Sequence, residues 1–294
     1  MGRVAFVNGQ YVPHGLASVH VEDRGYQFAD GVYEVIPVIA GKQIDGIGHR
    51  ERLARSLREL RITPPMTDRA LALVIEEVIR RNRVRTGHVY LQITRGVAPR
   101  DHAFPADPES AIVVYANSKP AGGLGKQAEV GVQVITAPDQ RWARCDIKTV
   151  GLLPNCLAKQ SAREAGAHEA FMYDADGYVT EGSSTNAWIV DGEGRLVTRP
   201  VSHDILNGIT RLSLISLVEG EGIEVVERPF TVEELKSARE VFLTSASALA
   251  TPVVQVDDRV IGNGRPGSVT SRLVEIFRNY VASEQVDAAA GKTI

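Results

Sequence analysis

The sequence predicts an α+β fold of two domains, a smaller N-terminal α/β sandwich and a larger C-terminal domain with a barrel-like sheet. In the first 119 residues, short strand-like and helix-like segments come in runs rather than in strict alternation. A stretch rich in Gly and Pro follows at 118–125, and many short strand-like segments separated by turn residues come after it. We therefore expect a small domain over 1–119, a linker over 120–126, a large domain over 127–285 and a flexible tail over 286–294.

The small domain is expected to begin with a β-hairpin, because Asn8-Gly9 separates two apolar stretches. A strand is expected at 33–39. Apolar residues at helical spacing predict two helices, at 49–60 and 68–82. The remaining expected elements of this domain are strands at 88–94 and 111–116.

The large domain is expected to consist of short strands separated by turns such as Asp174-Ala175-Asp176-Gly177, with helices between some of them. Many short strands in one region indicate a barrel-like or strongly twisted sheet. The expected strands are 130–135, 147–150, 169–173 and 186–190, and the expected helices are 155–165, 210–219 and 268–281.

The composition is that of an ordinary globular protein, with 44% hydrophobic and 23% charged residues and a net charge of −3. This charge argues against binding to nucleic acids or anionic membranes. No apolar run approaches the ~20 residues of a membrane helix, and the N-terminus lacks the apolar core of a signal peptide. Cys145 and Cys156 are too far apart for a CxxC motif, so we expect reduced thiols in a cytoplasmic protein. The histidines show no metal-ligand spacing, so we expect no metal site.

Only seven of the 33 basic residues are lysines, so there are few candidates for covalent chemistry. Lys148 lies between Ile147 and Val150 in a segment that alternates like a strand. Burial there would lower the pKa of its ammonium group and make it a nucleophile toward carbonyl carbons. The same pattern also fits a surface lysine on an edge strand. Lys159, on an expected helix, is the rival candidate.

Several other segments could bind a charged ligand, although each also has a purely structural interpretation. Glu181 precedes a hydroxyl-rich turn and could hold a charge on a cofactor ring. The segment 208–210 precedes a helix, whose N-terminal N–H groups could bind a phosphate. Arg52 could clamp a phosphate, and Arg100 and His102 could together bind a carboxylate. The structural alternatives are a polar turn, a capped helix, an exposed helical arginine and a basic loop.

Together these segments resemble, in order and over nearly the whole chain, the fold type IV pyridoxal-phosphate aminotransferases, and among them the D-amino-acid aminotransferases. Each motif is weakly specific alone, but their co-occurrence is highly specific. The motifs are Glu22–Phe28, Asp30–Val35, His49–Leu53, Thr94–Gly96, Pro99–His102, Arg144–Lys148, Leu157–Gln160, Thr180–Ser184, Gly208–Arg211 and Thr244-Ser245.

The resemblance implies a pseudo-barrel in the large domain, pyridoxal 5'-phosphate as cofactor, and transamination of D-alanine, D-glutamate or D-aspartate with 2-oxo acids such as 2-oxoglutarate or pyruvate. Lys148 resembles the Schiff-base lysine and general acid/base, and Glu181 resembles the partner of the pyridinium nitrogen. The implied phosphate site consists of Arg52, Ile209, Thr210, Ser245, Ala246 and Ser247. The implied substrate-binding residues are Tyr33, Val35, Arg100 and His102, the last two on a loop from the other subunit of a homodimer.

The sequence departs from the family pattern at two places. Ala246 stands where a hydroxyl residue is expected to help bind the phosphate, and Pro154-Asn155 also differs. Two alternatives remain open. One is a different activity on the same fold: a branched-chain L-amino-acid or amine transaminase, or an aminodeoxychorismate lyase. The other is a cofactor-free binding protein, for which Lys148 and Glu181 would be coincidental.

Overall fold

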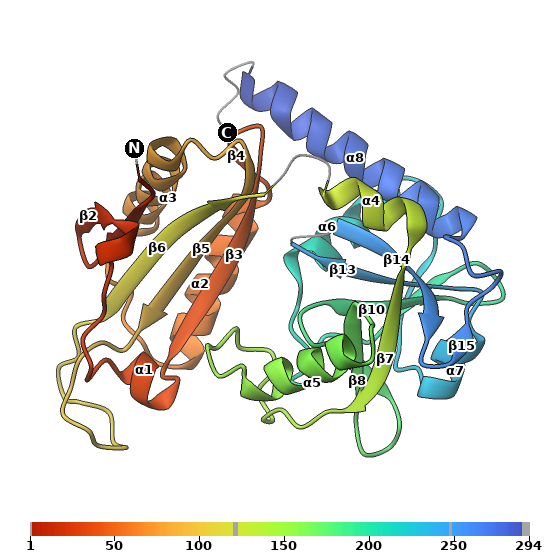
Figure 1. Cartoon of the computed structure of the whole chain (residues 1–294), viewed down its shortest axis with the longest axis horizontal. Helices are drawn as coiled ribbons and strands as arrows, with labels where there is room; N and C mark the ends of the chain where they lie inside the picture. Colours follow the sequence, from red (N-terminus) through yellow and green to blue (C-terminus); the bar gives the residue numbers. More distant parts are fainter. Residues whose placement is uncertain (1, 120–122, 247–248, 290–294) are drawn as a thin grey trace. The chain divides into compact units, whose positions relative to one another are not determined.

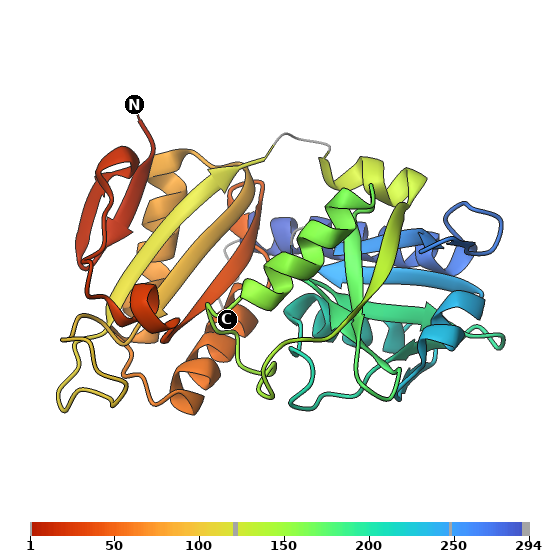
Figure 2. The same cartoon turned by 60° about the horizontal axis from the view of Figure 1, so that its bottom comes forward.

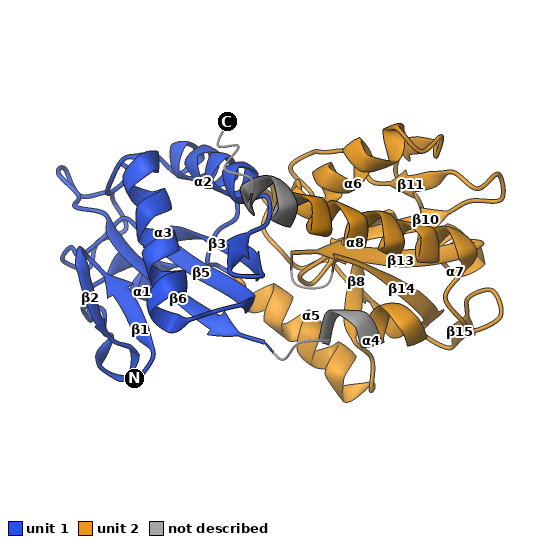
Figure 3. Ribbon diagram, turned by 90° about the horizontal axis from the view of Figure 1, so that it is seen from above, with its two compact units in different colours: residues 1–120, 147–151 blue, residues 121–146, 152–294 orange. Residues whose placement is uncertain are grey.

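The computed structural model describes residues 2–119, 123–246 and 249–289. It divides the chain into two compact units, shown in blue and orange in Figure 3. Unit 1 consists of Met1–Pro120 and Ile147–Gly151, and unit 2 consists of Ala121–Asp146 and Leu152–Ile294. Within the described residues, no helix is long and apolar enough to cross a membrane.

Unit 1 is built on a six-stranded antiparallel sheet, in the order β2-β1-β6-β5-β3-β4 among the residues that the structure describes. The expected hairpin is confirmed, because Asn8 and Gly9 join its first two strands with φ values of 44° and 90°, the left-handed conformations of a type I′ turn. The strands are β1 (Val4–Val7), β2 (Gln10–Pro13), β3 (Gly31–Ile39), β4 (Lys42–Gln43), β5 (Thr86–Thr94) and β6 (Ala111–Ser118). The helices are η1 (His14–Leu16), α1 (Arg24–Phe28), α2 (Gly46–Glu59) and α3 (Asp68–Asn82).

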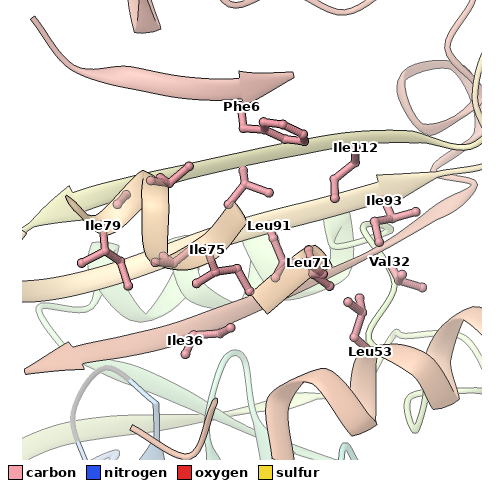
Figure 4. Close-up of a cluster of buried hydrophobic side chains, with 14 of the residues drawn as sticks. Phe6, Val32, Ile36, Leu53, Leu71, Ile75, Ile79, Leu91, Ile93 and Ile112 are labelled. Atoms are coloured by element: carbon pink, nitrogen blue, oxygen red, sulfur yellow. The ribbon is translucent and has the colours of Figure 1, made fainter. Parts of the chain in front are cut away.

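Helices α2 and α3 cover one face of this sheet (Figure 1). Along β3, alternate side chains point to opposite faces. Val32 and Ile36 belong to the core under the helices, Val32 near Leu53 of α2 and Ile36 near Ile75 of α3, as Figure 4 shows. Tyr33 and Val35 are half-buried and lie on the opposite face. The strand therefore presents one face to the core and leaves the other to carry polar and aromatic groups.

In its described part, unit 2 is built on a nine-stranded sheet, in the order β12-β11-β10-β13-β14-β7-β8-β9, with β15 paired to β14. Only 183–185 join β9 to β10, although β13, β14, β7 and β8 lie between them in the sheet order. The sheet therefore curls into a partial barrel, as we expected. The strands are β7 (Val132–Pro138), β8 (Glu169–Tyr173), β9 (Val179–Gly182), β10 (Asn186–Val190), β11 (Leu196–Thr198), β12 (Val225–Glu227), β13 (Glu240–Ser245), β14 (Leu249–Val256) and β15 (Arg259–Val260). The helices are α4 (Gly123–Val130), α5 (Leu153–Glu164), α6 (Ile209–Glu219), α7 (Val232–Ser237) and α8 (Ser268–Ala289).

Both faces of the curled sheet are buried, which explains why β10 and β13 are buried at almost every position and are mostly apolar. On β10, Ala187 and Ile189 face the core inside the curl, whereas Trp188 and Val190 pack in the second core, formed with α6 and α8. The Trp188 ring stacks on Phe242 of β13, with the ring centroids 5.4 Å apart. The sheet thus provides a rigid support for the polar residues at its strand ends.

The strand expected at 147–150 is not formed. Of these residues only Thr149 makes a β-bridge, an isolated one to Val32. The N–H of Thr149 donates to the carbonyl of Ile147 at 2.8 Å, and this tight turn prevents a longer ladder. The alternation of side chains therefore reflects a turn docked on β3.

Two further differences concern the expected linker and the expected tail. Helix α4 begins at Gly123, within the expected linker, of which 120–122 lie outside the described residues. Helix α8 extends to Ala289, beyond the expected start of the tail at 286, and 290–294 lie outside the description. The structure also contains elements that were not expected, namely η1, α1, α7, β4, β9 and β11 to β15.

Candidate active site

Lys148 is held by its backbone against the start of β3 in unit 1. The N–H of Tyr33 donates to the carbonyl of Lys148 at 3.0 Å, and the N–H of Val150 donates to the carbonyl of Gly31 at 3.1 Å. The Lys148 N–H donates to Oγ of Ser56, on α2, at 3.4 Å. Its Nζ atom lies 4.4 Å from the centroid of the Tyr33 ring, where the negative face of the ring attracts an ammonium group. A firmly anchored backbone thus carries an amine on the face of the sheet that the helices do not cover.

On the opposite face of β3, the carboxylate of Glu34 is fully buried. Arg52 donates to it from Nε at 2.8 Å and from Nη2 at 2.7 Å, and Nδ1 of His49 lies 2.7 Å from Oε2. Burial would raise the pKa of Glu34, but the charge and hydrogen bonds of Arg52 and His49 outweigh it and hold this pKa at about 2. Burial also lowers the pKa of His49, against the effect of Glu34. At neutral pH the group is therefore a buried Glu34–Arg52 ion pair with a neutral histidine.

We expect Glu34→Gln to lower the free energy of unfolding by about 3–5 kcal/mol, because Arg52 would stay charged without its carboxylate partner. The folded pKa of Glu34, about 2, lies below the unfolded value of ~4.3. Its stabilising contribution is therefore complete above ~4.3 and is lost as the pH falls toward the folded pKa. Denaturant unfolding between about pH 7 and about pH 3 should show a shallower pH dependence in the variant than in the wild type.

The matched control is Glu77→Gln, because Glu77 also pairs with arginine side chains, those of Arg80 and Arg81, but at the surface of α3. This variant should unfold nearly as the wild type does. If Glu34→Gln and Glu77→Gln have the same stability, the buried ion pair does not stabilise the fold as we describe.

The loop that carries Arg100 and His102 follows β5 and lies beside α1 (Figure 2). The buried guanidinium of Arg24 donates to the carbonyl groups of Asp101 at 2.6 Å and of His102 at 3.4 Å. The guanidinium of Arg100 lies 4.6 Å from the centroid of the Phe28 ring, and the His102 ring lies 5.4 Å from the same ring. Both side chains are thus placed together on one aromatic platform, an arrangement that can bind a carboxylate through two donors.

In unit 2, Glu181 lies on β9 with both carboxylate oxygens in hydrogen bonds. Nη1 of Arg141 donates to Oε1, and Nδ2 of Asn186 donates to Oε2 at 3.0 Å. The backbone N–H of Leu206 also donates to the carboxylate, at 3.1 and 3.2 Å from the two oxygens. The side chain is almost completely buried. This environment holds a carboxylate in one fixed orientation.

The N-terminus of α6 offers an anion-binding position in the same unit. Gly208 is the N-cap residue and provides no side-chain cap, and a Cβ atom on it would collide with Oδ1 of Asn186. Ile209 and Thr210, the first residues of the helix, are buried. The first N–H groups of a helix and the positive end of its dipole favour a phosphate. The sequence requires glycine here because the backbone passes so close to Asn186.

Asn186 brings these parts of unit 2 together, a role that the sequence did not indicate. Its Nδ2 donates to Glu181 and, at 2.9 Å, to the carbonyl of Leu206, close to the start of α6. In the sheet it pairs with Thr244, next to Ser245 at the end of β13. Ala246 follows β13, whereas Ser247 lies outside the described residues. The structure therefore places Glu181, Ile209, Thr210 and Ser245 around one end of the β10–β13 pair.

Two expected residues have structural partners. Arg52, expected at a phosphate, binds Glu34 in unit 1. Lys159, the rival of Lys148, donates to the carbonyl of His168 and lies 3.5 Å from the buried carboxylate of Glu169. Its amine thus belongs to an ion pair between α5 and β8. Arg141 was missed as a site residue, and its only signal in the sequence is its position shortly before Lys148.

Comparisons with known proteins identify the family and the fold. The family model described as amino-transferase class IV matches residues 31–256. The D-alanine aminotransferase of Staphylococcus haemolyticus is 42% identical over 278 residues, which cover 95% of this chain and 98% of that protein. The D-alanine aminotransferase of Bacillus licheniformis is 40% identical over 94% of this chain and 96% of that protein.

Solved structures with the same fold include the branched-chain amino acid aminotransferase of Escherichia coli, with a TM-score of 0.89 and 29% identity. The match covers 95% of this chain and 94% of that chain. A T.th. branched-chain amino acid aminotransferase with pyridoxamine 5'-phosphate has a TM-score of 0.88 and 29% identity, and the match covers 100% of this chain and 96% of that chain.

Proposed function

The chain belongs to the class IV aminotransferase family, and we propose that it transaminates D-amino acids with 2-oxo acids, with pyridoxal 5'-phosphate as its cofactor. The observation that carries the choice of D-amino acids is the placement of Arg100 and His102 side by side on the Phe28 ring. The D-alanine aminotransferases at 40–42% identity support it. D-alanine, D-glutamate and D-aspartate are the proposed donors, and 2-oxoglutarate and pyruvate are the proposed acceptors.

The residues of unit 2 fit this cofactor. A phosphate group suits the N-terminus of α6, where Gly208 leaves the backbone without a Cβ atom beside Asn186. A protonated ring nitrogen suits the buried carboxylate of Glu181. When bound, the cofactor supplies an aldehyde that links to amines and a ring that accepts the electron pair released at the substrate Cα.

We propose that Lys148 is the point of covalent attachment and the group that moves the proton at the substrate Cα. Its backbone is fixed on β3 while its side chain reaches over Tyr33, so that Nζ is tethered at the end of a long side chain. Glu181 holds a positive charge at the ring nitrogen. The proposed phosphate-binding residues are Ile209, Thr210, Ser245, Ala246 and Ser247, with Arg52 as a further candidate.

The substrate is proposed to be bound by Tyr33, Val35, Arg100 and His102. Because Lys148 acts from one fixed direction, the Cα–H bond must point toward it. Exchanging the positions of carboxylate and side chain then exchanges the enantiomer that reacts. Holding the carboxylate at Arg100 and His102 directs the side chain to the opposite side, which we propose selects D-amino acids. We also propose that this loop serves the other subunit of a homodimer.

A branched-chain L-amino-acid aminotransferase is the second candidate, because the chain shares its fold with solved enzymes of that activity. A panel of donors separates the two. With pyruvate or 2-oxoglutarate as acceptor, D-alanine, D-glutamate or D-aspartate should react faster than L-leucine, L-valine or simple amines. Faster turnover of L-leucine or L-valine than of any D-amino acid would replace the first proposal with the second.

Arg100→Ala is expected to raise KM for every carboxylate donor and acceptor by about 10- to 150-fold, because a charge-assisted hydrogen bond contributes about 1.5–3 kcal/mol. The absorbance of the bound cofactor should not change, since Arg100 is proposed to bind only the substrate. Steady-state kinetics with D-alanine and pyruvate provide the measurement. Arg80→Ala, on the exposed surface of α3, is the control. Equal KM values for the wild type and Arg100→Ala would remove Arg100 from the binding site.

A further inference from the structure

We infer that Asp139 is a positioning residue that neutralises Arg141, so that Glu181 keeps its full negative charge toward the ring nitrogen of the cofactor. This inference rests on the proposed function, in which Glu181 pairs with that nitrogen. An arginine in direct contact with Glu181 would otherwise cancel the charge that Glu181 is proposed to provide.

The guanidinium of Arg141 is shared between two carboxylates. It donates to Glu181 from Nη1, and to Asp139 from Nε at 3.0 Å and from Nη2 at 2.7 Å. The backbone N–H of Arg141 also donates to Asp139, at 3.0 Å. Thr180, which precedes Glu181 on β9, donates from its hydroxyl to Asp139 at 2.7 Å. Asp139 is therefore tied both to Arg141 and to the strand that carries Glu181.

The charges of this cluster add up to −1, from two carboxylates and one guanidinium. Without Asp139, Arg141 and Glu181 would form a neutral pair. All three side chains are largely buried, with exposed fractions of 7% for Arg141, 7% for Glu181 and 11% for Asp139. Solvent therefore screens them little, and the loss of one charge is felt by the others.

The pKa shifts of Asp139 and Arg141 support a net charge of −1 for the cluster. Burial would raise the pKa of Asp139, but Arg141 and Thr180 outweigh it and hold this pKa below its ordinary value. Burial would lower the pKa of Arg141, whereas Glu181 and Asp139 raise it. Both residues of the Asp139–Arg141 pair are thus charged at neutral pH.

Two further titratable groups face the cluster without altering its charge. Burial raises the pKa of the Cys145 thiol to about 12, so that it is neutral. The carboxylate of Asp204 lies 2.8 Å from Nη2 of Arg199, which also binds Asp174, and the Asp204 side chain is 52% exposed, so that solvent screens its charge. The net charge around Glu181 therefore depends mainly on Asp139 and Arg141.

The experiment measures the proton affinity of the ring nitrogen in the holoenzyme, by nitrogen-15 NMR of labelled pyridoxal 5'-phosphate over a range of pH. Asp139→Asn keeps the shape and one of the two acceptor oxygens but removes the charge, and should lower the pKa of this nitrogen by about one unit, a tenfold loss in proton affinity. Asp139→Glu should restore it. Asp191→Asn, which breaks a similar pair with Arg195 at the surface of unit 2, is the matched control and should change nothing.

Arg141→Gln gives an independent test with the opposite sign, and it keeps the inference testable if Asp139→Asn does not fold. Removing the cation leaves two carboxylates and should raise the proton affinity of the ring nitrogen. A purely structural role would lower thermal stability in both variants without these opposite shifts. If the pKa of the ring nitrogen in Asp139→Asn or Arg141→Gln equals that in the wild type, the inference is overturned and the proposed function still stands. A wild-type enzyme that binds the cofactor with an unprotonated ring nitrogen overturns both the inference and the proposed role of Glu181.

Discussion

Lys148→Ala is expected to reduce transamination by at least about 10⁴-fold, because the variant loses the proposed proton carrier as well as the point of covalent attachment. The substitution should leave the fold intact. The contacts that fix this segment to β3 are made by the backbone, since the Lys148 carbonyl accepts the Tyr33 N–H and the Val150 N–H donates to Gly31. Borohydride reduction and peptide mapping of the wild type should therefore find the cofactor on Lys148, and the variant should contain no such adduct.

Lys159→Ala is the matched control. Lys159 is the other lysine that the sequence singled out, but its amine is held by the His168 carbonyl and by Glu169. This variant should keep the reducible link to the cofactor and most of its turnover. An adduct on Lys159, or normal turnover by Lys148→Ala, would refute the assignment of Lys148.

The elements that the sequence predicted well are defined by signals within a few residues. Helix α3 spans the expected 68–82, because Thr67 caps its start and Arg83 ends it in the left-handed conformation. The Thr67 hydroxyl accepts the N–H of Ala70 at 3.3 Å. The hairpin at Asn8-Gly9 is equally local. Such segments can be predicted because their own residues determine where they begin and end, without any tertiary contact.

The segment at 147–150 shows where local patterns fail. Its alternation fits a strand, yet its hydrogen bonds go to Gly31 and Tyr33, more than a hundred residues earlier in the chain. Since the partner is set by tertiary structure, no signal near Lys148 could distinguish a strand from a turn docked on β3. The role of Lys148 stays a prediction, and its support on β3 could not be predicted from the sequence.

The contacts of the site residues are also distant in sequence. Arg141 reaches Glu181 forty residues later, and Arg52 binds Glu34 on another element. The sequence around an arginine does not show which distant carboxylate the arginine will bind. The sequence accordingly did not indicate Glu34 as a partner of Arg52, and it gave Arg141 no role. Family resemblance supplied the residues proposed for chemistry, whereas the structure supplied the groups that orient and balance them.

Glu181→Gln is expected to lower kcat by about 10²–10³-fold, the usual range for the loss of one electrostatic stabiliser in an active site. A neutral amide cannot hold a positive charge at the ring nitrogen, so the proton at the substrate Cα becomes harder to remove. The cofactor should stay bound, because its phosphate and its link to Lys148 are proposed to involve other residues. Turnover of D-alanine with pyruvate, and absorbance of the bound cofactor after dialysis, provide the measurements.

Glu181→Gln should also lower the stability of the fold, independently of its effect on charge. Oε2 of Glu181 accepts from Nδ2 of Asn186, and the Leu206 N–H donates to both oxygens, so an amide nitrogen placed there would face donors only. The conflict should destabilise the variant by about 1–3 kcal/mol, and its thermal unfolding must be compared with its kcat. Glu193→Gln, an exposed glutamate in the same unit, should change neither quantity. A loss of stability with nearly normal kcat would mean that Glu181 orients Asn186 and the start of α6 without acting on the cofactor.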